Sequence, residues 1–231
     1  MHLILIPGFW LDASSWDEVV PGLEQAGHHA QPLTLPGLES KTADRAGITL
    51  RDHVDAVVAA IDAAPGPVAL VGHSGGGAIA HAAADARTDR IARVVYVDSW
   101  PTGAGGVINA GLPAANGEVP LPDWSMFDDE DLVDLDDQLR TAFRERAIPT
   151  PEHVTRDAQQ LFDEGRYDVP ATVIACEFPS AQLREWMDQG EPNLQELARL
   201  RDVEYVDLPT GHWPQFTRPA ELAAVIVKSV G

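Results

Sequence analysis

Residues 67–86, PVALVGHSGGGAIAHAAADA, decide the fold of this 231-residue chain. The apolar run 67–71 is short and bounded by proline, so it predicts a buried strand. Residues 75–86 predict a helix whose first turn carries almost no side-chain bulk. Between them stands Gly72-His73-Ser74-Gly75-Gly76, which matches the pattern G-x-S-x-G in a strand–turn–helix context. That context indicates a functional serine rather than a glycine-rich turn with an ordinary one.

Ser74 is the residue on which this prediction depends. We expect it to adopt a strained backbone conformation, with the flanking glycines letting the strand and the helix approach each other closely. Its Oγ would then lie above the sheet at the positive end of a helix dipole, which favours developing negative charge. Ser74 is therefore the candidate nucleophile.

Length and composition fit a single α/β domain over residues 1–231, with 45% hydrophobic residues and enough chain for a sizeable core. No apolar run approaches the ~20 residues needed to span a bilayer. The first predicted strand begins at His2, which predicts that no signal peptide precedes the fold. The single cysteine, Cys176, excludes an intramolecular disulfide. We therefore expect a cytoplasmic enzyme.

The formal net charge of −20 argues against nucleic acid and anionic membranes as partners, because phosphate binding requires clustered Lys and Arg. Seven acidic residues fall between Asp128 and Asp137. Their spacing lacks the glycine of a calcium-binding loop, so we expect a solvated surface there and no metal site.

Apolar segments alternate with amphipathic ones along most of the chain, which predicts a mainly parallel sheet covered by helices on both faces. The strands are expected at 2–7, 28–35 (an edge strand because of Pro32), 67–71, 91–97, 171–178 and 203–208. The helices are expected at 14–24, from a capping box at Thr49, at 75–86, near 180–189 and from about 217.

The alternation stops between Thr102 and about Asp168, where glycine, proline and acidic residues dominate. We interpret residues 102–168 as a cap inserted between two strands of the sheet. Two helices are expected within it, near 129–146 and 151–164.

Three motifs together resemble the α/β-hydrolase superfamily: Ile6-Pro7-Gly8-Phe9-Trp10, the Ser74 turn, and Gly211-His212-Trp213. The resemblance covers nearly the whole chain, and the order of serine before histidine matches the family. Within the superfamily, the chain looks similar to small, minimally capped members such as plant-type esterases and hydroxynitrile lyases. The resemblance implies an α/β-hydrolase fold with a short helical cap.

His212 is the candidate base. A serine is a poor nucleophile at neutral pH unless a base activates it, and that base requires an orienting carboxylate. His212 lies on a loop after the last predicted strand, late in the chain as the resemblance implies. The other histidines fall in a surface turn, on helices or in the predicted cap, except His73, which flanks the nucleophile.

Two residues are candidates for the carboxylate. In most relatives the acid follows the strand that corresponds to 171–178, where this chain offers only Glu177, with Pro179 at the place of the expected aspartate. Some superfamily members take the acid from the end of the strand after the nucleophile, which here is Asp98. Because Asp98 directly follows an apolar strand, it should emerge at the carboxyl edge of the sheet, where ligands bind. We favour Asp98 and keep Glu177 as the alternative.

The resemblance also implies an oxyanion hole formed by the backbone N–H groups of Phe9 and Gly75. Neither a cofactor nor a metal is required. Residues next to the motif loops are expected to line a substrate pocket, although the aromatic ones would also suit the core beneath the loops. These residues are Trp10, His73, Trp100 and Trp213.

The leading hypothesis is a serine hydrolase that cleaves a carboxylic ester, lactone or thioester of a small, largely apolar molecule through an acyl-enzyme on Ser74. One alternative is a lyase of the hydroxynitrile-lyase type on the same site. Such relatives rely on a cationic pocket residue, whereas the two lysines here, Lys41 and Lys228, are remote from the motifs. The other alternative is a non-catalytic binding protein on the same scaffold.

Overall fold

The computed structural model describes residues 1–231 and contains a six-stranded parallel sheet in the order β2-β1-β3-β4-β7-β8. Its strands are β1 (His2–Ile6), β2 (His29–Pro32), β3 (Val68–His73), β4 (Ile91–Val97), β7 (Ala171–Ala175) and β8 (Val203–Asp207). The predicted parallel sheet is confirmed, and so is the edge position of the strand that contains Pro32.

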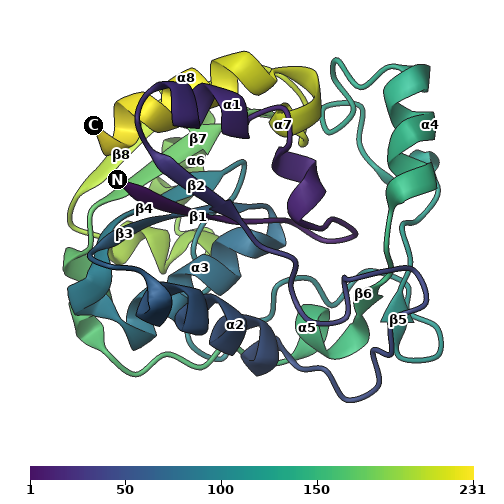
Figure 1. Cartoon of the computed structure of the whole chain (residues 1–231), viewed down its shortest axis with the longest axis horizontal. Helices are drawn as coiled ribbons and strands as arrows, with labels where there is room; N and C mark the ends of the chain where they lie inside the picture. The colour runs from purple at the N-terminus through teal and green to yellow at the C-terminus, as the bar shows by residue number, and fades with distance from the viewer.

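Helices cover both faces of this sheet (Figure 1). One face carries α1 (Val20–Gln25) and α8 (Pro219–Val230), and the other carries α2 (Leu50–Ala63) and α3 (Gly75–Ala86). Side chains alternate along each strand. In β1, Leu3 and Leu5 join the core with Ile226 of α8, whereas Ile4 and Ile6 join the core with Val57 of α2. No helix in the structure has both the length and the apolar character needed to cross a bilayer.

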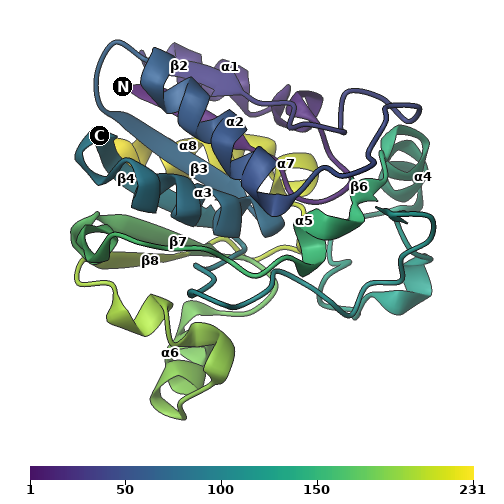
Figure 2. The ribbon, with the colours of Figure 1, turned by 90° about the horizontal axis from the view of Figure 1, so that it is seen from below.

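Two shorter helices follow the last two strands in the chain. The helix α6 (Ser180–Asp188) projects beyond β8 (Figure 2), and the short α7 (Pro214–Thr217) precedes α8. The capping box at the start of α2 is present as expected: Asp52 Oδ2 accepts from the Thr49 amide at 2.8 Å, and Thr49 Oγ1 accepts from the Asp52 amide at 3.2 Å.

The first helix differs from its prediction. The range 14–24 is divided into a 3₁₀ turn at Ala13–Trp16 and α1. Asp12 caps the turn by accepting from the Ser14 amide at 3.0 Å. The division falls before Pro21, which lacks an N–H group and is favoured in the first turn of a helix.

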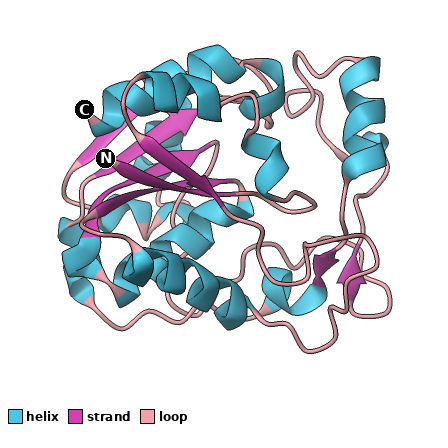
Figure 3. Cartoon of the chain, viewed as in Figure 1, coloured by secondary structure: helices cyan, strands magenta, loops and turns pink.

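The segment between β4 and β7 lies beyond the carboxyl ends of the strands (Figures 1 and 2). It holds the antiparallel pair β5 (Glu118–Val119) and β6 (Thr150–Pro151), the helices α4 (Asp137–Arg146) and α5 (Glu152–Arg156), and long loops (Figure 3). Both helices are shorter than predicted. Asp134 has a φ of 62°, which is incompatible with a helix there, and Asp136 caps α4 by accepting from the Leu139 amide at 2.9 Å. A function of this segment as a cap stays a prediction.

A buried charged network joins α3 to the segment around β7. Arg166 contacts Asp85 of α3 at 3.2 Å and donates through Nε to Glu196 at 2.8 Å. His81 of α3 bridges the same Glu196, at 3.1 Å, and the hydroxyl of Tyr96, at 2.9 Å. All five side chains are buried, so each charge here depends on its partners.

Candidate active site

Ser74 occupies the turn between β3 and α3 with φ 52° and ψ −127°. A positive φ is uncommon for a residue other than glycine, and a conformation of this kind stores about 1–3 kcal/mol of strain. Hydrogen bonds hold the turn on both sides, from the Ser74 amide to the Val97 carbonyl at 3.1 Å and from the Gly77 amide to the Ser74 carbonyl at 2.9 Å. The predicted strained turn is confirmed.

Glycines allow the chain to pack closely around this turn. A Cβ atom on Gly76 would lie 2.6 Å from the carbonyl oxygens of Ile6 and Pro7. A Cβ atom on Gly8 would lie 2.7 Å from the ring of His73 and 3.0 Å from Cβ of Ser74. The predicted close approach of the strand, the helix and the first loop therefore depends on glycines, which have no side chain.

We expect Gly76→Ala to lower the free energy of unfolding by about 1–3 kcal/mol, because the added methyl group meets backbone oxygens that have no space to move. Urea unfolding followed by circular dichroism measures the change. Gly66→Ala is the matched control, since a Cβ atom there meets nothing within 4 Å. Equal unfolding midpoints for the two variants would contradict the close packing.

His212 lies between Ser74 and Asp98. Its Nδ1 is 2.6 Å from Asp98 Oδ2, and its Nε2 is 2.8 Å from Ser74 Oγ. An ionised carboxylate can only accept, so Nδ1–H donates to Asp98 and Nε2 is left to accept from the serine hydroxyl. The structure therefore brings together the candidate nucleophile, the candidate base and the favoured candidate acid in one hydrogen-bonded chain.

The ends of neighbouring strands position the acid. Asp98 directly follows β4, which pairs in parallel with β7, so Asp98 lies beside Cys176 and Glu177. Asp98 Oδ1 accepts from the Cys176 amide at 2.9 Å and from the Glu177 amide at 3.3 Å. The side chain of Asp98 is 1% exposed. Its carboxylate is thus held on both oxygens, one by His212 and one by the chain after β7.

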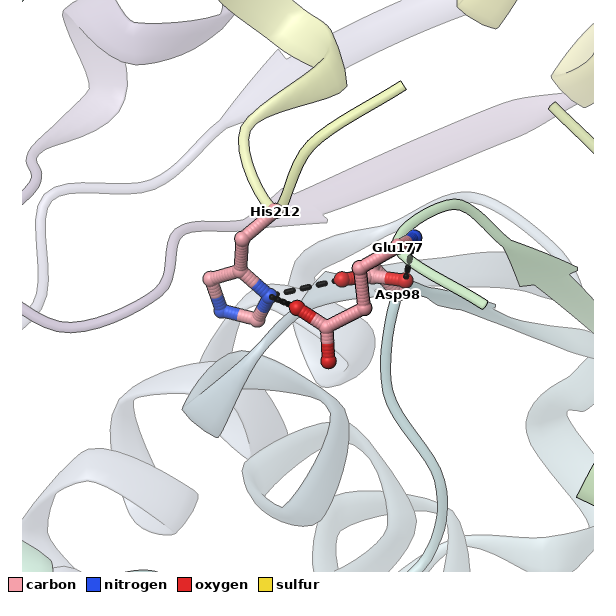
Figure 4. Close-up of side chains that lie close together, drawn as sticks. All are labelled: Asp98, Glu177 and His212. Atoms are coloured by element: carbon pink, nitrogen blue, oxygen red, sulfur yellow. Dashed lines mark hydrogen bonds and ion pairs between the residues drawn. The ribbon is translucent and has the colours of Figure 1, made fainter. Parts of the chain in front are cut away.

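The alternative acid, Glu177, also reaches His212 (Figure 4). Its Oε2 lies 3.4 Å from the same Nδ1, an ion-pair contact longer than the bond to Asp98. These three side chains also form a group whose possible metal-ligating atoms lie within 4.8 Å of one another. A cation could bind there only by displacing the proton on Nδ1, so we assign these residues no metal.

The charges around His212 set its protonation. Burial alone would lower the pKa of His212, but the hydrogen bonds and charges of Asp98 and Glu177 outweigh burial and raise this pKa above its ordinary value of 6.5. Beside them, burial, followed by the hydrogen bond and charge of Glu177, raises the pKa of Asp131 to about 6. The two carboxylates therefore stabilise the imidazolium that forms when His212 accepts the proton of Ser74.

The loop that carries His212 is held by the acidic segment 128–137. The His212 amide donates to the Asp131 carbonyl at 2.8 Å, and the Gly211 amide donates to the Val133 carbonyl at 3.0 Å. This segment is largely exposed, as expected, but Asp131 is half-buried and lines the cavity beside Ser74. No pattern in the sequence distinguishes Asp131 from the acids around it.

Two backbone amides beside Ser74 are available for an oxyanion. Gly75 is the first residue of α3, so its N–H has no acceptor within the helix. No hydrogen bond engages the Phe9 amide, whereas the next amide, that of Trp10, donates to Thr150 Oγ1 at 3.0 Å. Phe9 and Gly75 both line the cavity that contains Ser74 and His212.

This cavity has a volume of about 350 Å³. Trp10 and Trp100 form part of its wall, as expected, and neither lysine nor arginine lines it. The inserted segment supplies wall residues that no sequence pattern indicated, among them Ile108, Leu112, Met126 and Phe127.

Two residues expected in the wall do not line the cavity. Trp213 is 1% exposed and packs its ring against Trp124, Phe127 and Phe143, so it belongs to the core beneath the segment. His73 is fully buried, and its Nε2 donates to the His212 carbonyl at 2.6 Å. For Trp213 the structure therefore has the core packing that the sequence left open, and His73 is likewise packed away from the cavity.

A model of the Alpha/beta hydrolase family matches residues 3–225. Among curated proteins, a carbendazim hydrolyzing esterase from Nocardioides sp. (strain SG-4G) is 29% identical over 116 residues, 49% of this chain and 48% of the relative. Esterase PIR7B from Oryza sativa subsp. japonica is 38% identical over 103 residues, 42% of this chain and 37% of the relative. The matched part therefore spans less than half the length of these relatives.

Solved structures share the fold over nearly their whole length. An extracellular alpha/beta-hydrolase from a Paenibacillus species, described as sharing structural and functional homology with tobacco salicylic acid binding protein 2, has a TM-score of 0.77 and 21% identity, covering 99% of this chain and 98% of that one. The methylesterase MES16 from Arabidopsis has a TM-score of 0.74 and 18% identity, with 100% and 98% covered. The match over residues 3–225 shows that this chain belongs to the alpha/beta hydrolase family.

Proposed function

We propose that the protein is a serine hydrolase that cleaves carboxylic esters, lactones or thioesters of small, largely apolar molecules through an acyl-enzyme on Ser74. The observation that carries the proposal is the hydrogen-bonded chain from Ser74 Oγ through His212 to Asp98, with distances of 2.8 and 2.6 Å. The two curated relatives that match parts of the chain are both named esterases, which supports the same class.

In the proposed reaction, Ser74 Oγ attacks the substrate carbonyl while His212 Nε2 accepts the hydroxyl proton. Asp98 stabilises the imidazolium that forms, and the amides of Phe9 and Gly75 donate to the oxyanion, each contributing about 3 kcal/mol to the transition state. His212 then gives the proton to the leaving alcohol. A water molecule then attacks the carbonyl of the acyl-enzyme in the same way, with His212 accepting its proton. The reaction requires no cofactor.

The cavity supports a preference for neutral substrates. Trp10, Trp100 and Phe127 provide apolar walls, while Glu177 and Asp131 add negative charge that no lysine or arginine of the lining offsets. An anionic acyl group would face this charge in a partly desolvated site.

We therefore expect p-nitrophenyl butyrate to be hydrolysed with a kcat/KM at least about tenfold higher than an acyl ester of similar length that ends in a carboxylate, because like charges brought together in a binding site cost free energy. Steady-state kinetics at low and high salt measure the ratio. Salt should narrow the difference by screening the charges. Equal rates at low salt would contradict the assigned charge of the cavity.

Two further hypotheses concern the same site. The cavity is lined by neither lysine nor arginine, so it offers no support for the lyase alternative. A binding protein without catalysis would turn over no ester. A cytoplasmic location also belongs to the proposal, supported by the single, buried and unpaired Cys176.

Hydrolysis of a butyrate ester in ¹⁸O-labelled water tests the proposed reaction. The expected result is turnover by the protein with the label in the acid product and none in the alcohol, since water attacks the acyl carbonyl of the acyl-enzyme. Folded protein that releases no acid would overturn the proposed function and favour a binding protein.

A further inference from the structure

Two carboxylates from different strands converge on one nitrogen of His212. Asp98 follows β4 and Glu177 follows β7, and the parallel pairing of these strands places the two residues side by side. Asp98 Oδ2 lies 2.6 Å and Glu177 Oε2 lies 3.4 Å from His212 Nδ1. A single acid is enough to orient a histidine in a serine hydrolase, so the second one needs an explanation.

The two acids differ in how they are satisfied. Both oxygens of Asp98 are engaged, by His212 and by the amides of Cys176 and Glu177. Glu177 Oε2 is buried and has no hydrogen-bond donor, although its side chain as a whole is 18% exposed. An ionised oxygen without a donor is costly to bury unless a cation lies near it. His212 becomes that cation when it accepts a proton.

The surroundings contain no other positive group that could serve Glu177. His212 is faced by Ser74 and His73 at the end of β3, by Asp98 after β4, by Glu177 after β7, and by Asp131 from the inserted segment. Burial and the charge of His212 lower the pKa of His73 to about 3, so His73 stays neutral. His212 is therefore the one group beside Glu177 that can carry a positive charge.

We propose that Glu177 is a positioning residue for His212: it is a second acceptor for Nδ1–H that stabilises the imidazolium and keeps the ring oriented when Asp98 cannot accept. Less than 1 Å of movement brings Glu177 Oε2 from its present 3.4 Å to hydrogen-bond distance. This inference rests on the proposed serine hydrolase.

The two acids predict an unusual response to mutation. Replacing the single acid of a serine hydrolase by its amide lowers kcat by about 10⁴-fold, because the amide stabilises the wrong tautomer of the histidine. Here Glu177 can still accept from Nδ1–H, so we expect Asp98→Asn to lose only about 10²-fold. The double variant Asp98→Asn/Glu177→Gln should lose the full 10⁴-fold or so.

The single variant Glu177→Gln gives an independent readout. Removing one negative charge beside the imidazolium lowers the pKa of His212, and the neutral form that accepts the serine proton then exists at lower pH. The acid limb of the kcat/KM profile should shift to lower pH by about one pH unit. Glu204→Gln is the matched control, because Glu204 is exposed on β8 and the variant has the same change in net charge.

The experiment measures kcat/KM for p-nitrophenyl butyrate from pH 5 to 10 with wild type, the two single variants, the double variant and the control, each checked for folding by circular dichroism. An unshifted limb in Glu177→Gln, or equal losses for Asp98→Asn and the double variant, overturns the inference. If Asp98→Asn does not fold, the shift of the acid limb in Glu177→Gln alone tests the role of Glu177. Wild type that hydrolyses no ester overturns the proposed function itself, whereas an active wild type with an unshifted variant overturns only the role of Glu177.

Discussion

Ser74→Ala is expected to lower kcat for ester hydrolysis by about 10⁶-fold, the loss that removal of the nucleophile causes in a serine hydrolase. The hydroxyl of Ser74 has one hydrogen bond, to His212, and alanine, like serine, carries a Cβ atom at this positive φ. The free energy of unfolding should therefore change little. Initial rates at pH 8 and thermal unfolding measure the two quantities.

The matched control is Ser40→Ala, which removes an exposed hydroxyl from a loop. It should keep the wild-type rate. Ser74→Ala that retains activity within tenfold of wild type would show that water attacks the ester directly and that no acyl-enzyme forms on Ser74.

Arg166→Met is expected to cost about 3–5 kcal/mol of stability, because the substitution leaves the buried Asp85 without its cation and removes the shorter of the two arginine contacts of Glu196. Methionine preserves much of the side-chain volume. The loss of stability therefore comes from the missing charge rather than from a cavity. Urea unfolding at pH 7 gives the free energy. The variant tests whether the network holds the chain around β7 against α3.

Arg201→Met provides the comparison. Arg201 pairs with Asp168 on the surface, where both side chains are more than half exposed, and such pairs contribute about 0–1 kcal/mol. Similar losses for the two arginine variants would mean that the buried network contributes no more than a surface ion pair.

Much of the sheet and its helices could be predicted from the sequence, because capping residues, glycines and apolar runs mark where these elements begin and end. The helix after Ser74 spans residues 75–86 as expected, because small side chains begin it and Arg87 leaves helical geometry at its end. The helix after Thr49 starts at a capping box that is recognisable in the sequence. The inserted segment lacks such signals, and α5 ends at Arg156 where a helix to 164 was predicted. Its loops are held by contacts with distant residues, which periodicity does not encode.

The candidate site also contains residues that the sequence could place and residues that it could not. Asp98 and His212 follow parallel strands, whose carboxyl ends meet at one edge, so the sequence could place them with Ser74. The sequence could not show that Glu177 reaches the same nitrogen as Asp98, because that depends on the register between β4 and β7. Asp131 was missed for a similar reason, since the fold of the inserted segment alone brings it to the cavity.

Labelling with a fluorophosphonate at pH 8, followed by mass spectrometry of the peptides, tests the central claim most directly, because the reagent reacts only with an activated serine. The account predicts one adduct per chain, on the peptide that contains Ser74, and none in folded Ser74→Ala. Folded wild type that forms no adduct, or an adduct on another residue, would contradict a nucleophile at Ser74 activated by His212.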